Sequence, residues 1–271
     1  MSQQELDEIH NNVRDAYGKV AESNNDDGCC GVPTSCCGTA PDLEGFSIKL
    51  GYTADELKEV PGGADMGLGC GNPKVIASLT IGETVIDLGS GGGFDCFLAS
   101  KEVGEMGKVI GVDMTPAMLS KARKNAESSK YNNVEFRLGE IEFLPVPNDT
   151  ADVIISNCVI NLSPNKQQVF NEAFRALKPG GRLAISDVVA TCDLPDEVKN
   201  DLELYSACIS GASKIEDLEE CMNVAGFEQV SIEPKDDSDE FIRDWAPGRK
   251  IEELVVSAYI QAIKPMTKEN C

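Results

Sequence analysis

The feature that most constrains the fold is a regular alternation of short apolar segments with helical ones, which starts at Glu83. The apolar segments predict five strands, at Thr84–Leu88, Lys108–Val112, Val134–Leu138, Ala151–Ser156 and Arg182–Asp187. Helices are expected over Pro116–Ser129 and Lys166–Leu177, and Pro179-Gly180-Gly181 predicts a turn before the fifth strand. Strands that alternate with helices predict an α/β fold with a parallel sheet covered on both faces.

The order of elements changes after the fifth strand. Helices are expected over Pro195–Gly211, which carries Cys208, and over Lys214–Ala225. Two further strands follow, at Gln229–Glu233 and Leu254–Ile263, with no clear helix between them. The prediction is therefore a seven-stranded sheet with a helical insertion before its last strands.

An extension precedes this sheet. Apolar residues at helical spacing from Leu6 to Val20 predict an amphipathic helix, and Thr53 can cap a short helix that ends at Val60. The stretch from Gly28 to Gly38 between them is too rich in glycine, proline and cysteine for regular structure. We therefore divide the chain into an extension at 1–74, a main domain at 75–265 with an insertion around 190–212, and a tail at 266–271.

The charge of the chain narrows the choice of partners. There are 46 acidic residues against 24 lysines and arginines, a formal net charge of −22, and such a surface repels the phosphates of nucleic acids. The sequence contains no run of about 18 apolar residues, so we expect no membrane span. The first ten residues are polar and acidic and do not resemble a signal peptide. We expect a cytoplasmic monomer with no nucleic-acid or membrane partner.

Eleven cysteines in a cytoplasmic chain favour metal, metalloid or redox chemistry, because that compartment disfavours structural disulfides. The single histidine, His10, lies among polar residues of the first helix and is interpreted as a surface residue. Without a second histidine, a Ser-His-Asp hydrolase or a histidine-rich metal site is hard to build.

A glycine-rich loop follows the first strand, in Val85-Ile86-Asp87-Leu88-Gly89-Ser90-Gly91-Gly92-Gly93. Glycines allow the backbone to turn sharply and approach a ligand, and the helix that follows offers free N–H groups. Dehydrogenases bind a pyrophosphate with a similar loop, but Asp87 gives this one an anionic rim. Such a rim suits the ammonium and sulfonium of S-adenosylmethionine better than a pyrophosphate. The alternative is a sheet turn that binds no ligand.

Further cofactor contacts are expected from the neighbouring strands. Asp113 ends the second strand and is placed to accept the ribose hydroxyls, and the stretch from Glu140 to Glu142 can contact the adenine. The predicted cofactor-binding residues are Asp87, Gly89, Gly91, Gly93, Asp113, Met114, Glu140, Ile141, Glu142 and Asn157. Five strands followed by a strand pair, with a Pro-Gly-Gly turn, resemble the class I methyltransferase fold over about residues 75–265. This resemblance implies a Rossmann-like sheet whose seventh strand is antiparallel.

Three cysteines are expected around one cleft. Cys158 follows the fourth strand, where ligands of open α/β sheets bind, Cys208 lies in the insertion, and Cys70 lies in a glycine-rich loop. Inert burial remains the alternative for each one alone. Cys96 is interpreted as a core residue. Three others, interpreted as core, surface or tail residues, are Cys192, Cys221 and Cys271.

The sequences around these three cysteines resemble motifs of the arsenite methyltransferase family. The motifs are Gly67-Leu68-Gly69-Cys70-Gly71-Asn72-Pro73, Ser156-Asn157-Cys158-Val159-Ile160-Asn161-Leu162 and Tyr205-Ser206-Ala207-Cys208-Ile209-Ser210-Gly211-Ala212. The N-terminal cysteine pairs and the stretch from Phe241 to Trp245 also resemble that family. The resemblance implies that Cys70, Cys158 and Cys208 bind As(III) and that an N-terminal cysteine joins a redox cycle. Cys29, Cys30, Cys36 and Cys37 are the candidates for that role, with Cys37 included in the predicted catalytic set.

Soft thiolates suit a soft acceptor such as As(III). Three of them can hold arsenic in a pyramid whose free lone pair attacks the sulfonium methyl, so no general base is needed. A thiol pair can then return two electrons by closing a disulfide, which a thioredoxin or glutathione-type reductant must reopen. The expected substrate is arsenite or thiol-conjugated arsenic.

Two alternatives remain open. A methyltransferase acting on an oxygen or carbon of a small molecule, of the quinone type, would not need the three cysteines. A zinc-binding or thiol redox protein could use the N-terminal pairs, although these lack the C-x₂-C spacing of common zinc sites.

Overall fold

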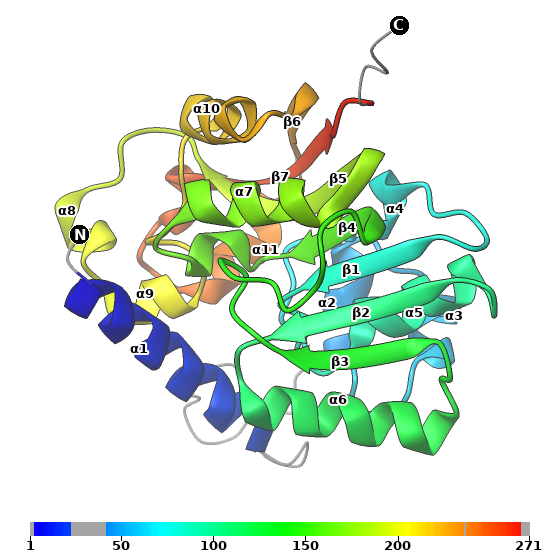
Figure 1. The fold of residues 1–271 in the computed structure, drawn as a ribbon. Coiled ribbons are helices and arrows are strands. Elements are labelled where there is room, and N and C mark those ends of the chain that lie inside the picture. Colours follow the sequence, from blue (N-terminus) through cyan, green and yellow to red (C-terminus); the bar gives the residue numbers. More distant parts are fainter. Residues whose placement is uncertain (1–2, 23–41, 236, 267–271) are drawn as a thin grey trace, which may run out of the picture.

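The computed structural model describes residues 3–22, 42–235 and 237–266. Its centre is a seven-stranded sheet in the order β3-β2-β1-β4-β5-β7-β6 (Figure 1). The strands are β1 Thr84–Leu88, β2 Lys108–Asp113, β3 Val134–Leu138, β4 Ala151–Asn157, β5 Leu177–Ala190, β6 Glu228–Pro234 and β7 Val255–Ile263. Strands β1 to β5 pair in parallel, and β7 runs antiparallel between β5 and β6. The predicted α/β class and the seven strands are confirmed.

The core forms on both faces of this sheet, because successive residues of a strand point to opposite faces. Val85 of β1 packs with α4 Lys74–Ala77, α5 Phe94–Val103 and α6 Pro116–Ser129. The next residue, Ile86, packs on the other face. Helices α7 Lys166–Ala176 and α10 Ile215–Ala225 cover that face. Both faces of the sheet are therefore buried, which explains why its strands are almost continuously apolar.

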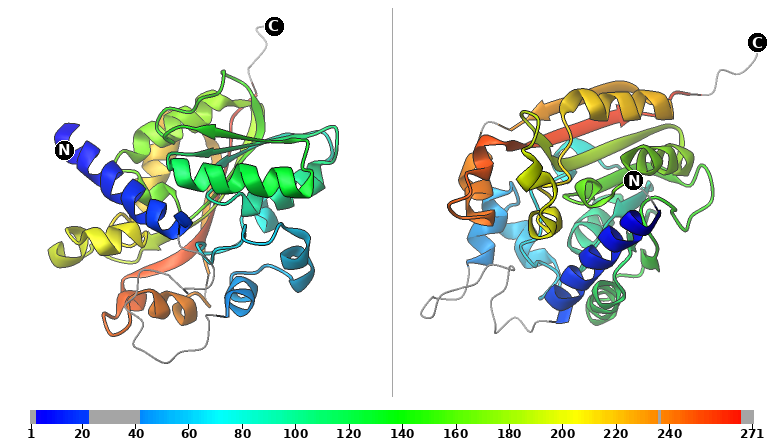
Figure 2. Two further views of the ribbon diagram at one scale, coloured as in Figure 1. Left: turned by 90° about the horizontal axis from the view of Figure 1, so that it is seen from below. Right: turned by 90° about the vertical axis from the view of Figure 1, so that its left-hand side faces the viewer.

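The first helix of the chain lies at the carboxyl ends of the strands. Helix α1 Gln3–Glu22 packs against α6 and α9 Leu202–Ser206, as the two further views show (Figure 2). Helices α2 Leu43–Lys49 and α3 Ala54–Glu59 follow, and Thr53 caps α3 as predicted, in a capping box with Glu56. The predicted glycine- and cysteine-rich stretch with Cys29, Cys30, Cys36 and Cys37 lies outside the described residues, and so does Cys271.

The sequence predicts a helical stretch over Pro195–Gly211, but the structure does not form one continuous helix there. It forms α8 Asp196–Lys199 and α9, because the side chain of Asp201 caps α9 by accepting from Glu203 N and Leu204 N and so restarts the helix. Cys208 lies beyond the end of α9, in a turn with φ of 64°.

Two other features differ from expectation. Strands β6 and β7 are separated by α11 Asp239–Trp245 and the 3₁₀ turn Ile251–Glu253, where no helix was expected. The Pro-Gly-Gly turn lies inside β5: Ala151 of β4 pairs with Leu177 and Val153 pairs with Arg182, so the residues between them bulge out. The 3₁₀ turn Ile160–Leu162 follows β4. Among the helices of described residues, none is both long and apolar enough to cross a membrane.

A substitution at Gly211 can test how closely the loop after Cys208 packs on the turn after β4. A β-carbon at Gly211 would collide with the backbone oxygen of Asn161, which cannot rotate away. We expect Gly211→Ala to lower the free energy of unfolding by about 1–3 kcal/mol in urea titrations. Gly18→Ala is the control, because nothing lies within 4 Å of its β-carbon position in α1 and alanine favours a helix. Equal stabilities of the two variants would contradict this packing.

Candidate active site

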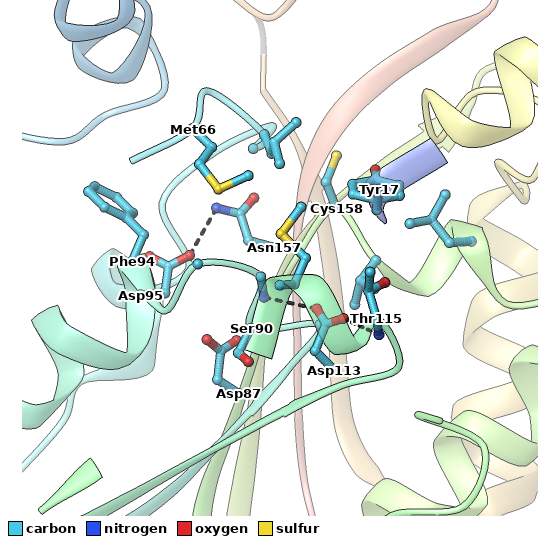
Figure 3. A pocket seen from close by; sticks show the side chains of 18 of the residues that line it. Tyr17, Met66, Asp87, Ser90, Phe94, Asp95, Asp113, Thr115, Asn157 and Cys158 are labelled. Atoms are coloured by element: carbon cyan, nitrogen blue, oxygen red, sulfur yellow. Dashed lines mark hydrogen bonds between the residues drawn. The ribbon is translucent and has the colours of Figure 1, made fainter. Parts of the chain in front are cut away.

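A pocket opens where β1, β2 and β4 end, and α1 forms one of its walls through His10, Val13 and Tyr17 (Figure 3). The predicted residues that line it are Asp87, Gly89, Gly91, Asp113, Met114, Ile141, Glu142, Asn157 and Cys158. Gly93, Glu140, Cys70 and Cys208 are not among the lining residues. The pocket therefore brings together residues from most of the predicted segments.

The glycine loop needs its glycines for conformation and for space. Gly89, Gly91 and Gly93 all have positive φ, a region that side chains disfavour. A β-carbon at Gly89 would also collide with the side chain of Val159. Gly93 caps α5, and a β-carbon there would lie 2.8 Å from the rings of Phe97 and Phe136, so its role is in packing rather than in the pocket.

Ser90 Oγ is buried in this loop without a hydrogen-bond partner within the described chain. Its residue lines the pocket, and an unpaired buried hydroxyl is costly unless a ligand or water satisfies it. The loop thus offers a polar contact that a bound molecule can complete.

Two carboxylates, Asp87 and Asp95, face the pocket next to this loop. Both are buried, and neither forms an ion pair with another described residue. Burial raises the pKa of Asp87 well above its usual range and raises the pKa of Asp95 to about 6. Their mutual repulsion adds to the effect at Asp87. A cationic ligand would relieve both penalties. Cys96, predicted to be a core residue, is buried and donates to Asp87 Oδ2 at 3.1 Å.

Asp113 ends β2 and is held rigidly. Its carboxylate accepts from Gly91 N at 2.9 Å and from Thr115 N at 2.7 Å, and burial raises its pKa. These bonds fix the carboxylate at the pocket wall, where it can accept further hydrogen bonds from hydroxyl groups of a ligand.

The loop after β3 meets α1. Glu142 accepts from His10 Nε2 at 3.1 Å and from Ser163 Oγ. Burial alone would raise the pKa of Glu142, but these two bonds outweigh it and lower the pKa. Glu140 instead pairs with Arg14 at 3.2 Å. The interpretation of His10 as a surface residue was wrong, since its side chain is 16% exposed and lines the pocket.

The three predicted thiols come together beside the pocket. The sulfurs of Cys70 and Cys158 and a carboxylate oxygen of Asp187 all lie within 4.8 Å of one another. Cys208 Sγ donates to the carbonyl oxygen of Cys158 at 2.7 Å. All three cysteines are buried and free of disulfides. Burial raises the pKa of Cys70 and, more strongly, that of Cys158, which also contacts the two other thiols.

Cys158 and Cys208 both have left-handed backbone conformations, with φ of 57° and 64°. This region costs a residue with a β-carbon of order 1 kcal/mol or more, and such strain clusters at functional sites. The fold therefore carries a conformational cost at both residues, whose thiols contact each other.

Asp187 was not predicted as a site residue, although it ends the predicted fifth strand. It accepts hydrogen bonds from the backbone of Val188 at 2.8 Å and Ile160 at 2.9 Å and from the side chain of Asn161 at 2.9 Å. Burial raises its pKa to about 6. Asp187 thus ties β5 to the turn that follows Cys158.

Asn157 was predicted to contact the cofactor, and it does line the pocket. Its amide is already bound to the loop that carries Cys70, accepting from Cys70 N at 3.1 Å and donating to Gly71 O at 2.8 Å. Its neighbours Tyr52 and Asp95 were not predicted.

Comparison with known proteins decides the family. A profile described as a methyltransferase domain matches residues 79–228. An arsenite methyltransferase of Halobacterium salinarum is 52% identical over 266 residues, which cover 96% of this chain and 67% of that protein. The chain belongs to the arsenite methyltransferase family. A family member from Aquipseudomonas alcaligenes is 40% identical over 81% of this chain, which spans 62% of that relative.

A solved structure agrees with this assignment. The crystal structure of an arsenic(III) S-adenosylmethionine methyltransferase from Chlamydomonas reinhardtii superimposes with a TM-score of 0.61 at 32% identity. The match covers 85% of this chain and 76% of that one. S-Adenosylmethionine is therefore the cofactor of this arsenite methyltransferase family member, and the paired acids Asp87 and Asp95, the unpaired hydroxyl of Ser90 and the fixed carboxylate of Asp113 fit it.

The contact between His10 and Glu142 makes the attachment of α1 depend on pH. The hydrogen bond to Glu142 raises the pKa of His10, an effect reinforced by Glu140 and opposed by burial and Arg14. A raised pKa in the folded state stabilises the fold fully below the unfolded value of about 6.5, and this contribution is lost as pH rises through the folded pKa.

We therefore expect His10→Gln to destabilise the protein most at about pH 6 and least at alkaline pH. Urea unfolding at several pH values measures this difference. Arg182→Gln is the control, because its ion pair with Glu83 lies at the start of β1 and away from His10, and arginine stays charged throughout, so its loss should cost the same at each pH. A difference for His10→Gln that does not vary with pH would contradict the ion pair.

Proposed function

We propose that the protein transfers a methyl group from S-adenosylmethionine to As(III) bound by Cys70, Cys158 and Cys208. The observation that carries this proposal is the convergence of three buried, free thiols from distant segments next to the pocket that fits the cofactor. A methyltransferase acting on oxygen or carbon has no use for such a cluster. A zinc or redox protein has no use for the cofactor pocket.

The protonation state of the thiols suits arsenite. The raised pKa values of Cys70 and Cys158 keep these thiols neutral at neutral pH. Arsenite is also neutral there, as As(OH)₃. Three thiols and As(OH)₃ condense to a trithiolate and three waters, so no net charge is buried and no proton is released. Burial, which disfavours thiolate anions, does not oppose this reaction.

The bound arsenic keeps a lone pair, which can act as the nucleophile. S-Adenosylmethionine supplies an electrophilic methyl group, and the residues that would hold it are Asp87, Asp95, Asp113 and Ser90. Attack by a lone pair removes no proton, so the site needs no general base. The part played by the chain is to hold arsenic with its lone pair exposed beside the pocket, which converts a bimolecular encounter into a positioned one.

Transfer of CH₃⁺ to As(III) formally oxidises arsenic to As(V). Two thiolates that close a disulfide return two electrons and restore As(III), so a thioredoxin or glutathione-type reductant must reopen the disulfide before the next cycle. Cys29, Cys30, Cys36 and Cys37 remain our candidates for the N-terminal thiol, with Cys37 in the proposed catalytic set. We propose that the protein works as a monomer in the cytoplasm, on arsenite or thiol-conjugated arsenic.

The direct test is incubation with arsenite, methyl-labelled S-adenosylmethionine and a dithiol, followed by separation of labelled arsenicals. We expect Cys158→Ser and Cys208→Ser to lose methylation while still binding the cofactor, because a serine oxygen is a hard ligand and holds As(III) poorly. Cys192→Ser is the matched control, since Cys192 is exposed. Wild-type turnover by Cys158→Ser would rule out the thiol site.

The three thiols should differ in which methylation they serve. As(OH)₃ can form three As–S bonds, whereas a monomethylated arsenical can form two. We expect Cys70→Ser to slow the first methylation more than the second, because two thiols remain for the second. Rates measured separately with arsenite and with monomethylarsonous acid test this. Equal losses in both steps would contradict the division.

A further inference from the structure

The loop that carries Cys70 fits closely between β4 and β5. A β-carbon at Gly69 would lie 2.9 Å from the amide nitrogen of Asn157, and one at Gly71 would collide with Ser186 Oγ. The two glycines that flank Cys70 therefore let its backbone lie directly against side chains of β4 and β5. Ser257 Oγ of β7 holds the carbonyl of Cys70 at 2.7 Å.

Asn157 binds both sides of the Cys70 peptide. Its Oδ1 accepts from Cys70 N at 3.1 Å and lies 3.8 Å from Cys70 Sγ, and its Nδ2 donates to Gly71 O at 2.8 Å. A side-chain amide can satisfy a backbone donor and a backbone acceptor at once, through two separate atoms. The position of the Cys70 sulfur thus depends on the orientation of this amide.

The orientation of the amide is set by two further residues. Asn157 Nδ2 also lies 3.0 Å from Tyr52 OH and 3.2 Å from Asp95 Oδ2. Tyr52 OH in turn donates to Asp95 Oδ1 at 2.6 Å. Both partners present oxygens as acceptors, so they favour the orientation in which Nδ2 faces them and Oδ1 is left to accept from Cys70 N.

The same group of residues faces the cofactor pocket. Tyr52, Asp95 and Asn157 all line it, and Figure 3 shows the hydrogen bond between Asn157 and Asp95 at its wall. Asp95 has no ion-pair partner among the described residues. Its carboxylate therefore faces the pocket, where it can contact a cationic cofactor, and also accepts from the amide of Asn157 that holds Cys70.

The other two thiols are held by contacts that do not involve the amide of Asn157, although Cys70 Sγ also donates to Ser186 O, at 3.5 Å. Cys158 N donates to Ser186 O at 2.8 Å, and Cys208 Sγ donates to the carbonyl of Cys158. Among the described residues, no hydrogen bond links Tyr52 or Asp95 to either Cys158 or Cys208. A change at Tyr52 should therefore act on Cys70 and leave the pair of Cys158 and Cys208 in place.

We propose that Tyr52 and Asp95 are positioning residues that act through Asn157 to place Cys70 as the third arsenic ligand. This inference rests on the proposed function. If so, Tyr52 and Asp95 should affect the binding of an arsenical that forms three As–S bonds and not of one that forms two. Arsenite uses three and needs Cys70, whereas an organic arsenical such as phenylarsine oxide uses two and does not.

Tyr52→Phe is the sharpest test, because it removes one hydroxyl and keeps the ring that packs edge-on against Phe94 with centroids 4.8 Å apart. We expect binding of arsenite by the full chain to weaken roughly tenfold, the usual effect of losing a buried hydrogen bond. Binding of phenylarsine oxide should stay unchanged. Equilibrium dialysis under reducing conditions measures both. Tyr131→Phe is the matched control, since its hydroxyl binds Glu59 O outside the pocket.

The alkylation rate of Cys70 by iodoacetamide, followed by mass spectrometry, gives a readout that does not depend on activity. We expect the rate to rise in Tyr52→Phe and, through the same amide, in Asp95→Asn, while Cys158 reacts as in the wild type. Unchanged arsenite affinity and unchanged Cys70 reactivity in both variants would overturn the inference. Equal weakening for arsenite and phenylarsine oxide would also overturn it, since general damage to the site would explain that result. Failure of the wild-type protein to bind arsenite would instead refute the proposed function.

Discussion

The turn at the end of β4 is the point on which the whole site depends. Asn157 and Cys158 are adjacent there, yet they serve different partners: the amide of Asn157 holds the Cys70 loop, and the carbonyl of Cys158 holds the thiol of Cys208. Asp187 binds the backbone just beyond this turn and locks it to β5. Because parallel strands end at one edge of the sheet, this single turn can collect groups from three separate segments.

Electrostatics gives the site its second constraint. Five buried carboxylates surround it: burial raises the pKa of Asp87, Asp95, Asp113 and Asp187, whereas hydrogen bonds lower that of Glu142. Lys166, whose charge acts to lower the pKa of Asp187, donates to Gly211 O at 2.7 Å. Such surroundings favour a cationic cofactor and a neutral metalloid acid, and they oppose oxyanions such as phosphate or arsenate.

The sheet could be predicted from the sequence because its signal is local. Strands β1 and β3 match the expected bounds, since a buried parallel strand is a short apolar run between polar turns. The region after β5 was predicted less well. Pro195–Gly211 has helical composition throughout, and only the capping geometry of Asp201 reveals the break in it. Helix α11 has only seven residues, too few for a clear periodic pattern.

The convergence of Cys70, Cys158 and Cys208 could be predicted because Cys158 follows a strand at the ligand-binding edge of the sheet and because the sequences around all three resemble known family motifs. The supporting residues were not. His10 reads as a surface residue until the fold brings Glu142, 132 positions away, beside it. Tyr52 and Asp95 have no local pattern that marks them, because their roles arise only when the Cys70 loop folds over β4. What a side chain binds across such distances is decided by packing, which a single sequence does not display.

The left-handed backbone at Cys158 and Cys208 has an evolutionary consequence. Glycine or asparagine would relax both turns, so folding stability by itself selects against cysteine at these two positions. Cysteine persists there only while its sulfur is useful to the organism. In a lineage that is no longer exposed to arsenic, we expect these two positions to be substituted early. Replacement by glycine or asparagine should raise the free energy of unfolding.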